Sequence, residues 1–277
     1  MIDLSRVSAL HPDDAGIWRP ASHSSSDISF PEDGHDACFA IENDSFWYAH
    51  RNACITAALR QQSIRGPVLD IGGGNGAVSQ ALERAGIETV LLEPGDAGAR
   101  NARRRGLASV ACATLEEAQI GRGSFAAAGL FDVIEHVEDD VRLLRDTRAV
   151  LSPGGSVCVT VPAFQWLWSD EDEVAGHYRR YTRTSLRAAL EQAGFAIVYE
   201  TYLFAALVPA VFAMRSLPHR LLHRSTEAVA RGAEQQHVPN PWSRRVMDAA
   251  LRPERHLVEL GRSVPVGTSC LAIAVRD

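Results

Sequence analysis

The chain has 277 residues, which fits one large α/β domain with an added segment and is short for two enzymatic domains. Its net charge of −6 makes nucleic acid an unexpected partner, because binding to phosphates needs a concentrated basic surface. Five scattered cysteines without a Cys-x-x-Cys pair favour reduced thiols over a disulfide framework or a zinc site. Together with a start that lacks an apolar leader, this predicts a cytoplasmic protein.

Residues 1–40 are rich in Ser, Pro, Asp and His and show no periodicity, so we expect an irregular N-terminal arm. A disordered tail is the alternative. Trp18, Phe30 and Phe39 speak against it, because a fully solvated tail has no need of large apolar groups. The arm is therefore expected to fold over the mouth of a ligand site.

A helix is predicted from about Glu42, with Ser45 among the possible N-caps and apolar residues at helical spacing behind it. The helix carries Trp47 and Arg51 near its start. In one interpretation Trp47 packs on the sheet and Arg51 faces solvent. In the other, both side chains contact a ligand, since a guanidinium can hold a carboxylate with two hydrogen bonds.

The segment from Val68 to Gly76 reads as a buried strand that breaks into a glycine-rich turn, and a helical pattern follows from Ala77. Glycine in such a turn lets a ligand approach backbone N–H groups at the start of a helix. The unit of strand, glycine turn and helix predicts a ligand site at the turn.

Two ligand classes use such a turn. Gly72, Gly74 and Ala77 match the relaxed dinucleotide pattern, which leaves a nicotinamide-dependent reductase open. Asp70 argues against it, because a carboxylate at the end of the strand would repel a pyrophosphate and attract the ammonium of S-adenosylmethionine. Glu93 ends the next strand, about 20 residues after the first glycine, where an acid accepts hydrogen bonds from ribose hydroxyls.

Strands and helices alternate through the rest of the chain, which predicts a parallel sheet with right-handed crossovers. The last predicted strand is separated from the sixth by about 60 residues, an insertion that the sheet does not require. The predicted strands, numbered one to seven, span residues 68–71, 89–93, 108–112, 125–131, 156–161, 195–202 and 266–275.

The chain resembles the class I S-adenosylmethionine-dependent methyltransferases. The likeness covers roughly residues 46–195, and its elements stand in the family's order: Val68 to Gly76, Glu93, Ala113 to Glu116, Leu130 to Val137, and Leu151 to Gly155 followed by a strand. The resemblance implies an α/β, Rossmann-like sheet of seven strands in the order 3-2-1-4-5-7-6, with the last strand antiparallel and helices on both faces. It implies three regions: the arm at 1–40, a methyltransferase domain at 41–204 plus 266–277, and a helical insertion at 205–265.

The resemblance also assigns roles around the donor, S-adenosylmethionine. Asp70 with the backbone of Gly72 and Gly74 would hold the methionine part, Glu93 the ribose, and Thr114 and Leu115 the adenine edge. Phe131 would form a wall near the sulfonium, although packing on the sheet is an equal interpretation for it. The full set expected at the donor is Trp47, Arg51, Asp70, Gly72, Gly74, Asn75, Glu93, Pro94, Thr114, Leu115, Phe131 and Asp132.

Proton transfer from the acceptor needs a base, and imidazole titrates near neutral pH. His136 and His177 both follow strands at the edge where open α/β sheets bind ligands, so they are the predicted bases, with Tyr181 as a third catalytic candidate. A structural hydrogen-bonding role is the alternative for each histidine. Arg179 and Arg180 would bind an acidic acceptor or pair with the acidic run 170–173 just upstream.

Asp132, Glu135 and His136 also stand in the arrangement of the divalent-metal ligands of ubiquinone-pathway O-methyltransferases. The same spacing recurs in the wider family without a metal, and we expect none here. An Asn/Asp-Pro-Pro-aromatic motif of amino-methylating nucleic-acid enzymes is absent.

The resulting prediction is an enzyme that transfers a methyl group from S-adenosylmethionine to a small molecule. Oxygen is preferred over nitrogen or carbon as the methylated atom. An N- or C-methyltransferase of a natural product or lipid-like acceptor, a reductase and a non-catalytic cofactor-binding protein are the alternatives. The apolar stretch 204–217 is interrupted by Pro209 and falls short of the roughly 20 residues that cross a bilayer. With the basic residues that follow it, segment 204–224 could instead contact a membrane surface. The acceptor's identity and the oligomeric state cannot be read from the sequence.

Overall fold

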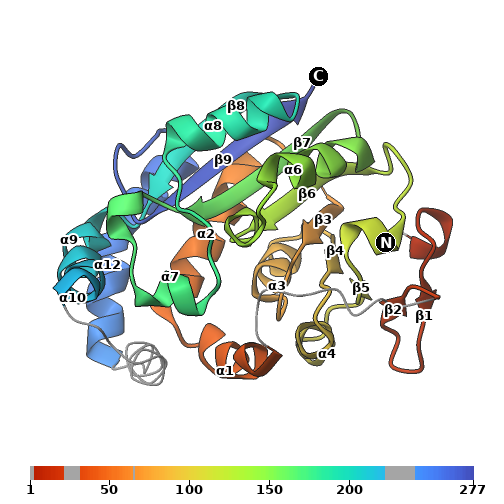
Figure 1. Cartoon of the computed structure of the whole chain (residues 1–277), viewed down its shortest axis with the longest axis horizontal. Coiled ribbons are helices and arrows are strands. Elements are labelled where there is room, and N and C mark those ends of the chain that lie inside the picture. The colour runs from red at the N-terminus through yellow and green to blue at the C-terminus, as the bar shows by residue number, and fades with distance from the viewer. Residues whose placement is uncertain (1–2, 22–31, 65, 222–240) are drawn as a thin grey trace.

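In the part of the chain that the structure describes, a nine-stranded sheet runs through the centre, with helices on both faces (Figure 1). The computed structural model describes residues 3–21, 32–64, 66–221 and 241–277. The strands are β1 (His11–Pro12), β2 (Trp18–Arg19), β3 (Val68–Ile71), β4 (Thr89–Leu92), β5 (Val110–Ala111), β6 (Phe125–Phe131), β7 (Leu151–Pro162), β8 (Phe195–Leu203) and β9 (Ser269–Arg276).

The helices follow the strands along the chain. The α-helices are α1 (Glu32–Glu42), α2 (Phe46–Gln61), α3 (Ala77–Arg84), α4 (Asp96–Arg104), α5 (Leu115–Ala118), α6 (Asp140–Val150), α7 (Asp170–Val174), α8 (Arg183–Gln192), α9 (Val208–Val211), α10 (Leu217–Leu221) and α12 (Pro241–Glu259). The short 3₁₀ helices are η1 (Leu4–Arg6), η2 (Ile134–His136), η3 (Gln165–Leu167) and η4 (Ala205–Leu207), and η5 (Phe212–Ser216) is a π-helix.

The sheet order is β1-β2-β5-β4-β3-β6-β7-β9-β8. The prediction of seven strands is therefore wrong in number and in its full order, because β1 and β2 of the N-terminal arm extend the sheet beyond β5. Between β5 and β8 the neighbours are β5-β4-β3-β6-β7-β9-β8, and β9 is antiparallel to both β7 and β8.

Alternation along the strands gives each sheet face its own core. Leu69 and Val90 face a cluster that includes residues of α5, α6 and α8. Val68 faces the opposite cluster, to which α2, α3 and α12 contribute, and Leu91 on that same face packs with residues of α4. Because strands buried on both faces carry apolar residues at nearly every position, the sequence shows them as continuous apolar runs.

The N-terminal arm is more regular than predicted. Strand β2 pairs with β5 through Trp18 and Ala111, and Leu4 and Leu10 are buried in the core. Arg19 holds Asp13 at 2.7 Å and Asp96 at 2.6 Å, which fixes the arm to the start of α4. Two-residue strands have no periodicity, so the sequence pattern could not reveal them; Phe30, named in the same argument, lies outside the described residues.

Helix α2 begins at Phe46, and Ser45, one of the predicted N-caps, accepts a hydrogen bond from the backbone N–H of Trp47. The predicted start at Glu42 is wrong, because Glu42 is the last residue of α1, a helix largely within the arm that was predicted to be irregular. Residues Leu151 to Gly155, which the resemblance places before the fifth strand, are instead part of β7, which begins at Leu151 and shifts register against β6.

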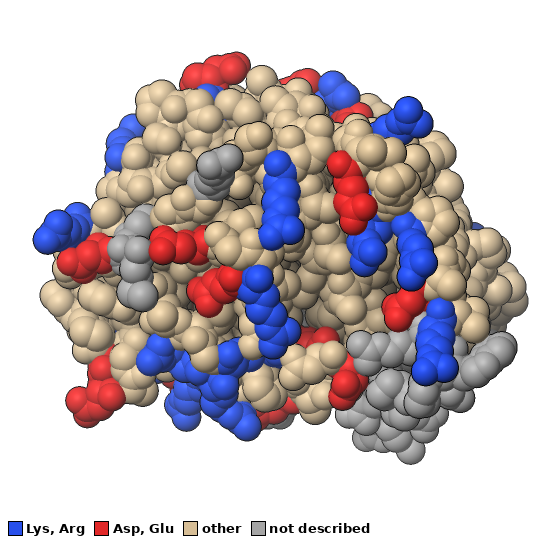
Figure 2. Space-filling view, turned by 180° about the vertical axis from the view of Figure 1, so that it is seen from behind, with Lys and Arg blue, Asp and Glu red and all other residues tan. Residues whose placement is uncertain are grey.

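Acidic and basic side chains are interspersed over the face seen from behind (Figure 2). That view shows no single continuous basic band among the residues it describes.

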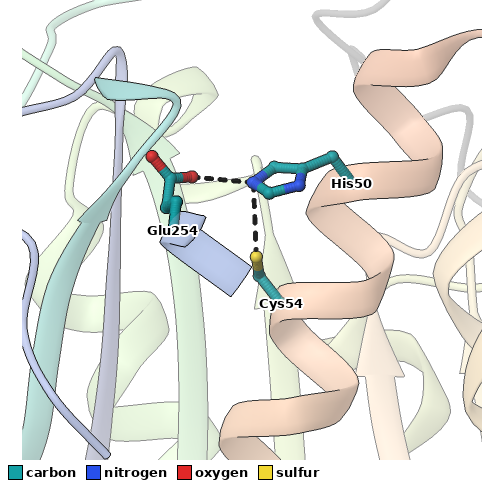
Figure 3. Close-up of side chains that lie close together, drawn as sticks. All are labelled: His50, Cys54 and Glu254. Carbon is teal, nitrogen blue, oxygen red and sulfur yellow. Dashed lines mark hydrogen bonds and ion pairs between the residues drawn. The ribbon is translucent and has the colours of Figure 1, made fainter. Parts of the chain in front are cut away.

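The described part of the insertion is helical and is anchored to α2 by a buried cluster (Figure 3). Nε2 of His50 lies 2.7 Å from Oε1 of Glu254 on α12 and 3.4 Å from Sγ of Cys54. The same carboxylate accepts the backbone N–H groups of Phe204, at 2.6 Å, and Ala205, at 2.7 Å. Imidazole, thiol and carboxylate are also metal ligands, but this carboxylate already has three N–H partners, so we assign it a structural role. No described helix is long and apolar enough to span a membrane.

Candidate functional site

The carboxyl ends of β3, β4, β6 and β7 gather most of the side chains predicted from the sequence. In an open α/β sheet this edge binds ligands, because loops diverge there and helix N-termini point toward it. The residues fall into a donor side, after β3 and β4, and an acceptor side, after β6 and β7.

The glycine turn leaves open space on the donor side. Gly74 has φ of +52°, and no atom lies within 4 Å of the place where a Cβ would stand. Gly72 also has a positive φ, and a Cβ there would come within 2.9 Å of Val133. A side chain at Gly74 would therefore meet strain and fill space that a ligand can use.

Asp70 lies beneath this turn and is fully buried. Its Oδ2 accepts a hydrogen bond from the Ser79 hydroxyl at 2.6 Å, whereas its Oδ1 has no hydrogen-bond partner. Burial raises the pKa of Asp70 to about 6. The negative charge at neutral pH therefore acts through the turn on the open space above it, which suits a cationic ligand group.

Glu93 fixes the turn to the end of β4. Its carboxylate accepts the N–H of Gly74 at 2.8 Å and the N–H of Gly95 at 2.7 Å. His35 of α1, with Nε2 3.9 Å from Oε1, approaches from the arm. Burial raises the pKa of Glu93 to about 7, and the carboxylate keeps acceptor capacity for ligand hydroxyls. His35 was missed by sequence reasoning, since nothing in the arm's pattern marks it.

Asn75 and Pro94 flank these two acids. Asn75 donates to the carbonyl of His35 at 2.7 Å and accepts from Asn101 at 3.1 Å, so its amide connects the turn to α1 and α4. The Pro94 carbonyl accepts a weak hydrogen bond from the Cys112 thiol at 3.6 Å. Both residues hold the frame of the donor side in this structure.

Thr114 and Leu115 stand at the start of α5. The Thr114 hydroxyl accepts the N–H of Glu117 at 3.1 Å, and the Glu117 carboxylate accepts the N–H of Thr114 at 2.9 Å. This is a capping box, and its Thr-x-x-Glu pattern is visible in the sequence. The predicted contact of these residues with adenine stays a prediction.

Buried Arg51 stacks on Trp47 and pairs with Asp132, both of which are half-buried. The Arg51 guanidinium lies 4.7 Å from the Trp47 ring centre and 5.2 Å from that of Tyr48, and it pairs with Asp132. Asp132 also accepts from Thr160 at 3.1 Å. The carboxylate that Arg51 holds in this structure is therefore a protein group, and α2 is tied to the end of β6.

Phe131 is buried, and its ring lies against Gly129, where a Cβ would come within 2.4 Å of ring atoms. This is the sheet-packing alternative that the sequence left open. The strand admits the ring because residue 129 has no side chain.

On the acceptor side, His177 and His136 face each other with ring centres 4.6 Å apart. Nδ1 of His177 lies 2.8 Å from Oδ1 of Asp172. Burial by itself raises the pKa of Asp172, but hydrogen bonds from His177 and Arg180 outweigh it and lower that pKa to about 2. Asp172 is thus an anion at neutral pH that fixes the His177 ring. Burial together with His177 lowers the pKa of His136 to about 4.

The two arginines divide their partners. Arg180 contacts Asp172 at 2.7 Å, within the acidic run, which is one of the two alternatives that the sequence left open. Arg179 pairs instead with Asp140 at 3.4 Å, outside that run. The Tyr181 hydroxyl donates to Asp140 at 2.6 Å, and its ring is in the core. Tyr181 therefore has a structural hydrogen bond here, and we leave it out of the mechanism proposed below.

Glu135 is fully buried, and neither of its carboxylate oxygens has a hydrogen-bond partner. Burial and the nearby Asp132 raise its pKa. Among the described residues, Glu135, His136 and His177 bring three possible metal-ligand atoms within 4.8 Å of one another. The sequence pattern had placed Asp132 in this set, but Asp132 is engaged by Arg51 and Thr160. That no metal is needed stays a prediction.

A cavity of about 780 Å³ lies elsewhere, between α2, α3 and α12. Its lining includes Asn52, Arg60, Gln80 and Arg84 and none of the residues predicted at the donor or acceptor. The candidate site is thus an edge of the sheet and does not coincide with this cavity.

The chain matches a family model described as "Methyltransferase domain" over residues 48–200, more than half of its length. The match begins in α2, includes the glycine turn and ends in β8. It decides against the nicotinamide-dependent reductase that the glycine spacing left open.

Two curated relatives are ubiquinone biosynthesis O-methyltransferases. The protein of Xanthomonas oryzae pv. oryzae (strain PXO99A) is 30% identical over 96 residues, which are 32% of this chain and 40% of that protein. The protein of Bordetella avium (strain 197N) is 29% identical over the same shares. The chain thus matches less than half the length of these relatives.

Solved structures share the fold at low identity. Phosphoethanolamine N-methyltransferase 2 of Haemonchus contortus, in complex with S-adenosyl-L-methionine, is 15% identical with a TM-score of 0.56, covering 92% of this chain and 60% of that one. A possible histamine N-methyltransferase of Thermotoga maritima is 17% identical with a TM-score of 0.53, covering 88% and 96%. With the family match, these findings place the chain in the methyltransferase domain family, as a class I S-adenosylmethionine-dependent methyltransferase.

Proposed function

We propose that this methyltransferase methylates an oxygen of a small-molecule acceptor, with His177 accepting the acceptor's proton. The observation that carries the proposal is the hydrogen bond between Asp172 and Nδ1 of His177 at the ligand-binding edge of the sheet. With Nδ1 bonded to Asp172, Nε2 is the ring atom that can take a proton.

The residues of the donor side fit a donor that carries an ammonium group and ribose hydroxyls. The unpartnered oxygen of buried Asp70 and the open space at Gly74 favour a cationic group there. Glu93 would accept hydrogen bonds from the ribose hydroxyls, and Thr114 and Leu115 would flank the adenine. When bound, S-adenosylmethionine supplies an electrophilic methyl group on a sulfonium, and S-adenosylhomocysteine is the product.

The need for a base favours oxygen as the methylated atom. A neutral amine can attack first and lose its proton afterwards, whereas a hydroxyl must lose its proton as it attacks. The anion of Asp172 would stabilise the imidazolium that forms on His177, and the neighbouring His136 stays neutral at pH 7. The similarity to ubiquinone biosynthesis O-methyltransferases supports the same choice.

The partner is proposed to be a small molecule and not nucleic acid, in keeping with the mixed surface charge. Contact with a membrane surface through residues 204–224 stays a prediction, as does a cytoplasmic location. Within the described part of that segment Met214, Leu217 and Leu221 are exposed, and residues 222–224 lie outside the described residues.

The experiment is a methyl-transfer screen with S-adenosylmethionine labelled in its methyl group, using phenols, other hydroxyl compounds and matched amines. We expect label on a hydroxyl compound, strongly reduced in His177→Gln. Label found only on amines would overturn the choice of oxygen, and transfer at the normal rate in His177→Gln would overturn the role of His177.

A further inference from the structure

The segment of residues 212–221, which follows β8, contacts the stretch 166–171, which leads to the proposed base His177. Four polar side chains, at spacings of one, three and one along a helical path, share one face and bond to residues 166–171. The contacts are Arg215 to Glu171 at 2.5 Å, Ser216 to the carbonyl of Leu167 at 2.9 Å, His219 to Asp170 at 2.5 Å, and Arg220 to the carbonyl of Trp166 at 2.9 Å.

The polarity of this segment is the reverse of an ordinary surface helix. Its polar groups at 215, 216 and 219 face the protein, whereas Met214 is 57% exposed and Leu221 is 70% exposed. A surface helix normally buries its apolar side and exposes its polar side. The inward polar groups thus attach the segment to the rest of the chain, together with one ring contact, between Phe212 and Trp166, whose centres lie 5.8 Å apart.

Helix α7 connects this attachment to His177. Asp170 and Glu171 bond to the segment, while the next residue, Asp172, bonds to His177 and Arg180. The helix has five residues, a length that has little stability of its own. Its position therefore depends on the side-chain contacts at its two sides.

We infer that Arg215 and His219 are positioning residues, which hold α7 so that Asp172 keeps its hydrogen bond to His177. The inference rests on the proposed function in so far as His177 is the base. It gives the insertion a task in the reaction, since the part of the insertion that follows β8 would set the geometry of the proton acceptor.

The test measures the exchange with water of the His177 Nδ1–H by NMR, on the full chain labelled with ¹⁵N-histidine, with the signal assigned by its loss in His177→Gln. We expect Arg215→Gln to speed this exchange about fivefold, as removal of a partly exposed ion pair would allow. Arg215→Lys should restore it to within about twofold, because a single N–H contact to Glu171 remains possible.

Arg187→Gln is the matched control, since Arg187 on α8 also forms an ion pair, at 2.8 Å from Glu200 on β8. Its exchange rate should stay as in the unaltered protein. An unchanged rate in Arg215→Gln, with the fold intact by circular dichroism, would overturn the inference. The proposed function fails separately, if His177→Gln transfers methyl normally while Arg215→Gln still speeds the exchange.

Discussion

The donor side and the acceptor side treat their buried carboxylates differently. Asp70 and Glu93 accept hydrogen bonds from a hydroxyl and from backbone N–H groups, and burial raises the pKa of both. Asp132 and Asp172 are paired with arginines. A buried carboxylate without a cation costs stability, so its presence at the donor side indicates a place that a cationic ligand completes.

Glu135 is the exception on the acceptor side. Its two carboxylate oxygens lack hydrogen-bond partners, although Asp132 and Asp172 are near enough to affect its pKa. Its raised pKa favours a protonated, neutral carboxyl. A neutral group removes much of the cost of burial, so the contrast between the two sides concerns the charged carboxylates.

The largest expected effect is on the acceptor side and concerns turnover. Replacing His177 with Gln should lower kcat by about 10²- to 10⁴-fold, the usual contribution of a general base, with donor affinity unchanged. Steady-state kinetics with an acceptor from the methyl-transfer screen would measure it. His256→Gln is the control, because that histidine is exposed on α12. Turnover at the normal rate in His177→Gln would remove the base from the account.

Asp172→Asn should destabilise the fold, by about 3–5 kcal/mol, because it leaves the buried Arg180 without its anion. Urea unfolding at pH 7 measures the free energy of unfolding. The difference should shrink as the pH falls from about 4 toward 2, where the carboxylate of the unaltered protein also becomes protonated. A variant as stable as the unaltered protein at pH 7 would show that the pair of Asp172 and Arg180 contributes no net stability.

In the ligand-free protein, Asp70→Asn should raise the free energy of unfolding, whereas Asp172→Asn lowers it. The folded-state pKa of about 6 exceeds the ordinary value of 3.8, so ionised Asp70 costs the fold about 3 kcal/mol above pH 6, and the cost disappears below about pH 4. Asparagine can still accept the Ser79 hydroxyl. Urea unfolding at pH 8 and at pH 4 should therefore show a gain at the higher pH and none at the lower. A loss of stability at pH 8 would break the contrast between the two sides.

The same variant should lose donor affinity, by about tenfold, since the charge acts through the turn and not by direct contact. Calorimetric titration with S-adenosylhomocysteine at pH 8 measures this, and Asp146→Asn on the exposed face of α6 is the control. Unaltered affinity in Asp70→Asn would show that its charge does not select the ligand.

Most of the central sheet could be predicted because its strands are buried on both faces. The strand from Phe125 to Phe131 has the predicted bounds, and the glycine turn marks the ligand edge by a local pattern. Strands β1 and β2 could not be predicted, because two residues carry no periodicity and pairing with β5 is a tertiary contact.

The side chains of the site were found more readily than their partners. His136 and His177, both expected at the ligand-binding edge of the sheet, face each other, and their catalytic role stays a prediction. That Arg51 binds Asp132, or that Arg179 binds Asp140, depends on distances between segments far apart in sequence. Residue type fixes what a group can bind, and the fold decides which of several candidates it meets.

We propose that the turn above Asp70 selects a cationic methyl donor over a coenzyme that carries a pyrophosphate. Calorimetric titration of the unaltered chain with S-adenosylhomocysteine and, separately, with NADH tests it most directly. We expect S-adenosylhomocysteine to bind with a Kd of about 1–10 µM, in the ordinary range for small ligands, and NADH to give no heat. Binding of NADH without binding of S-adenosylhomocysteine would contradict it.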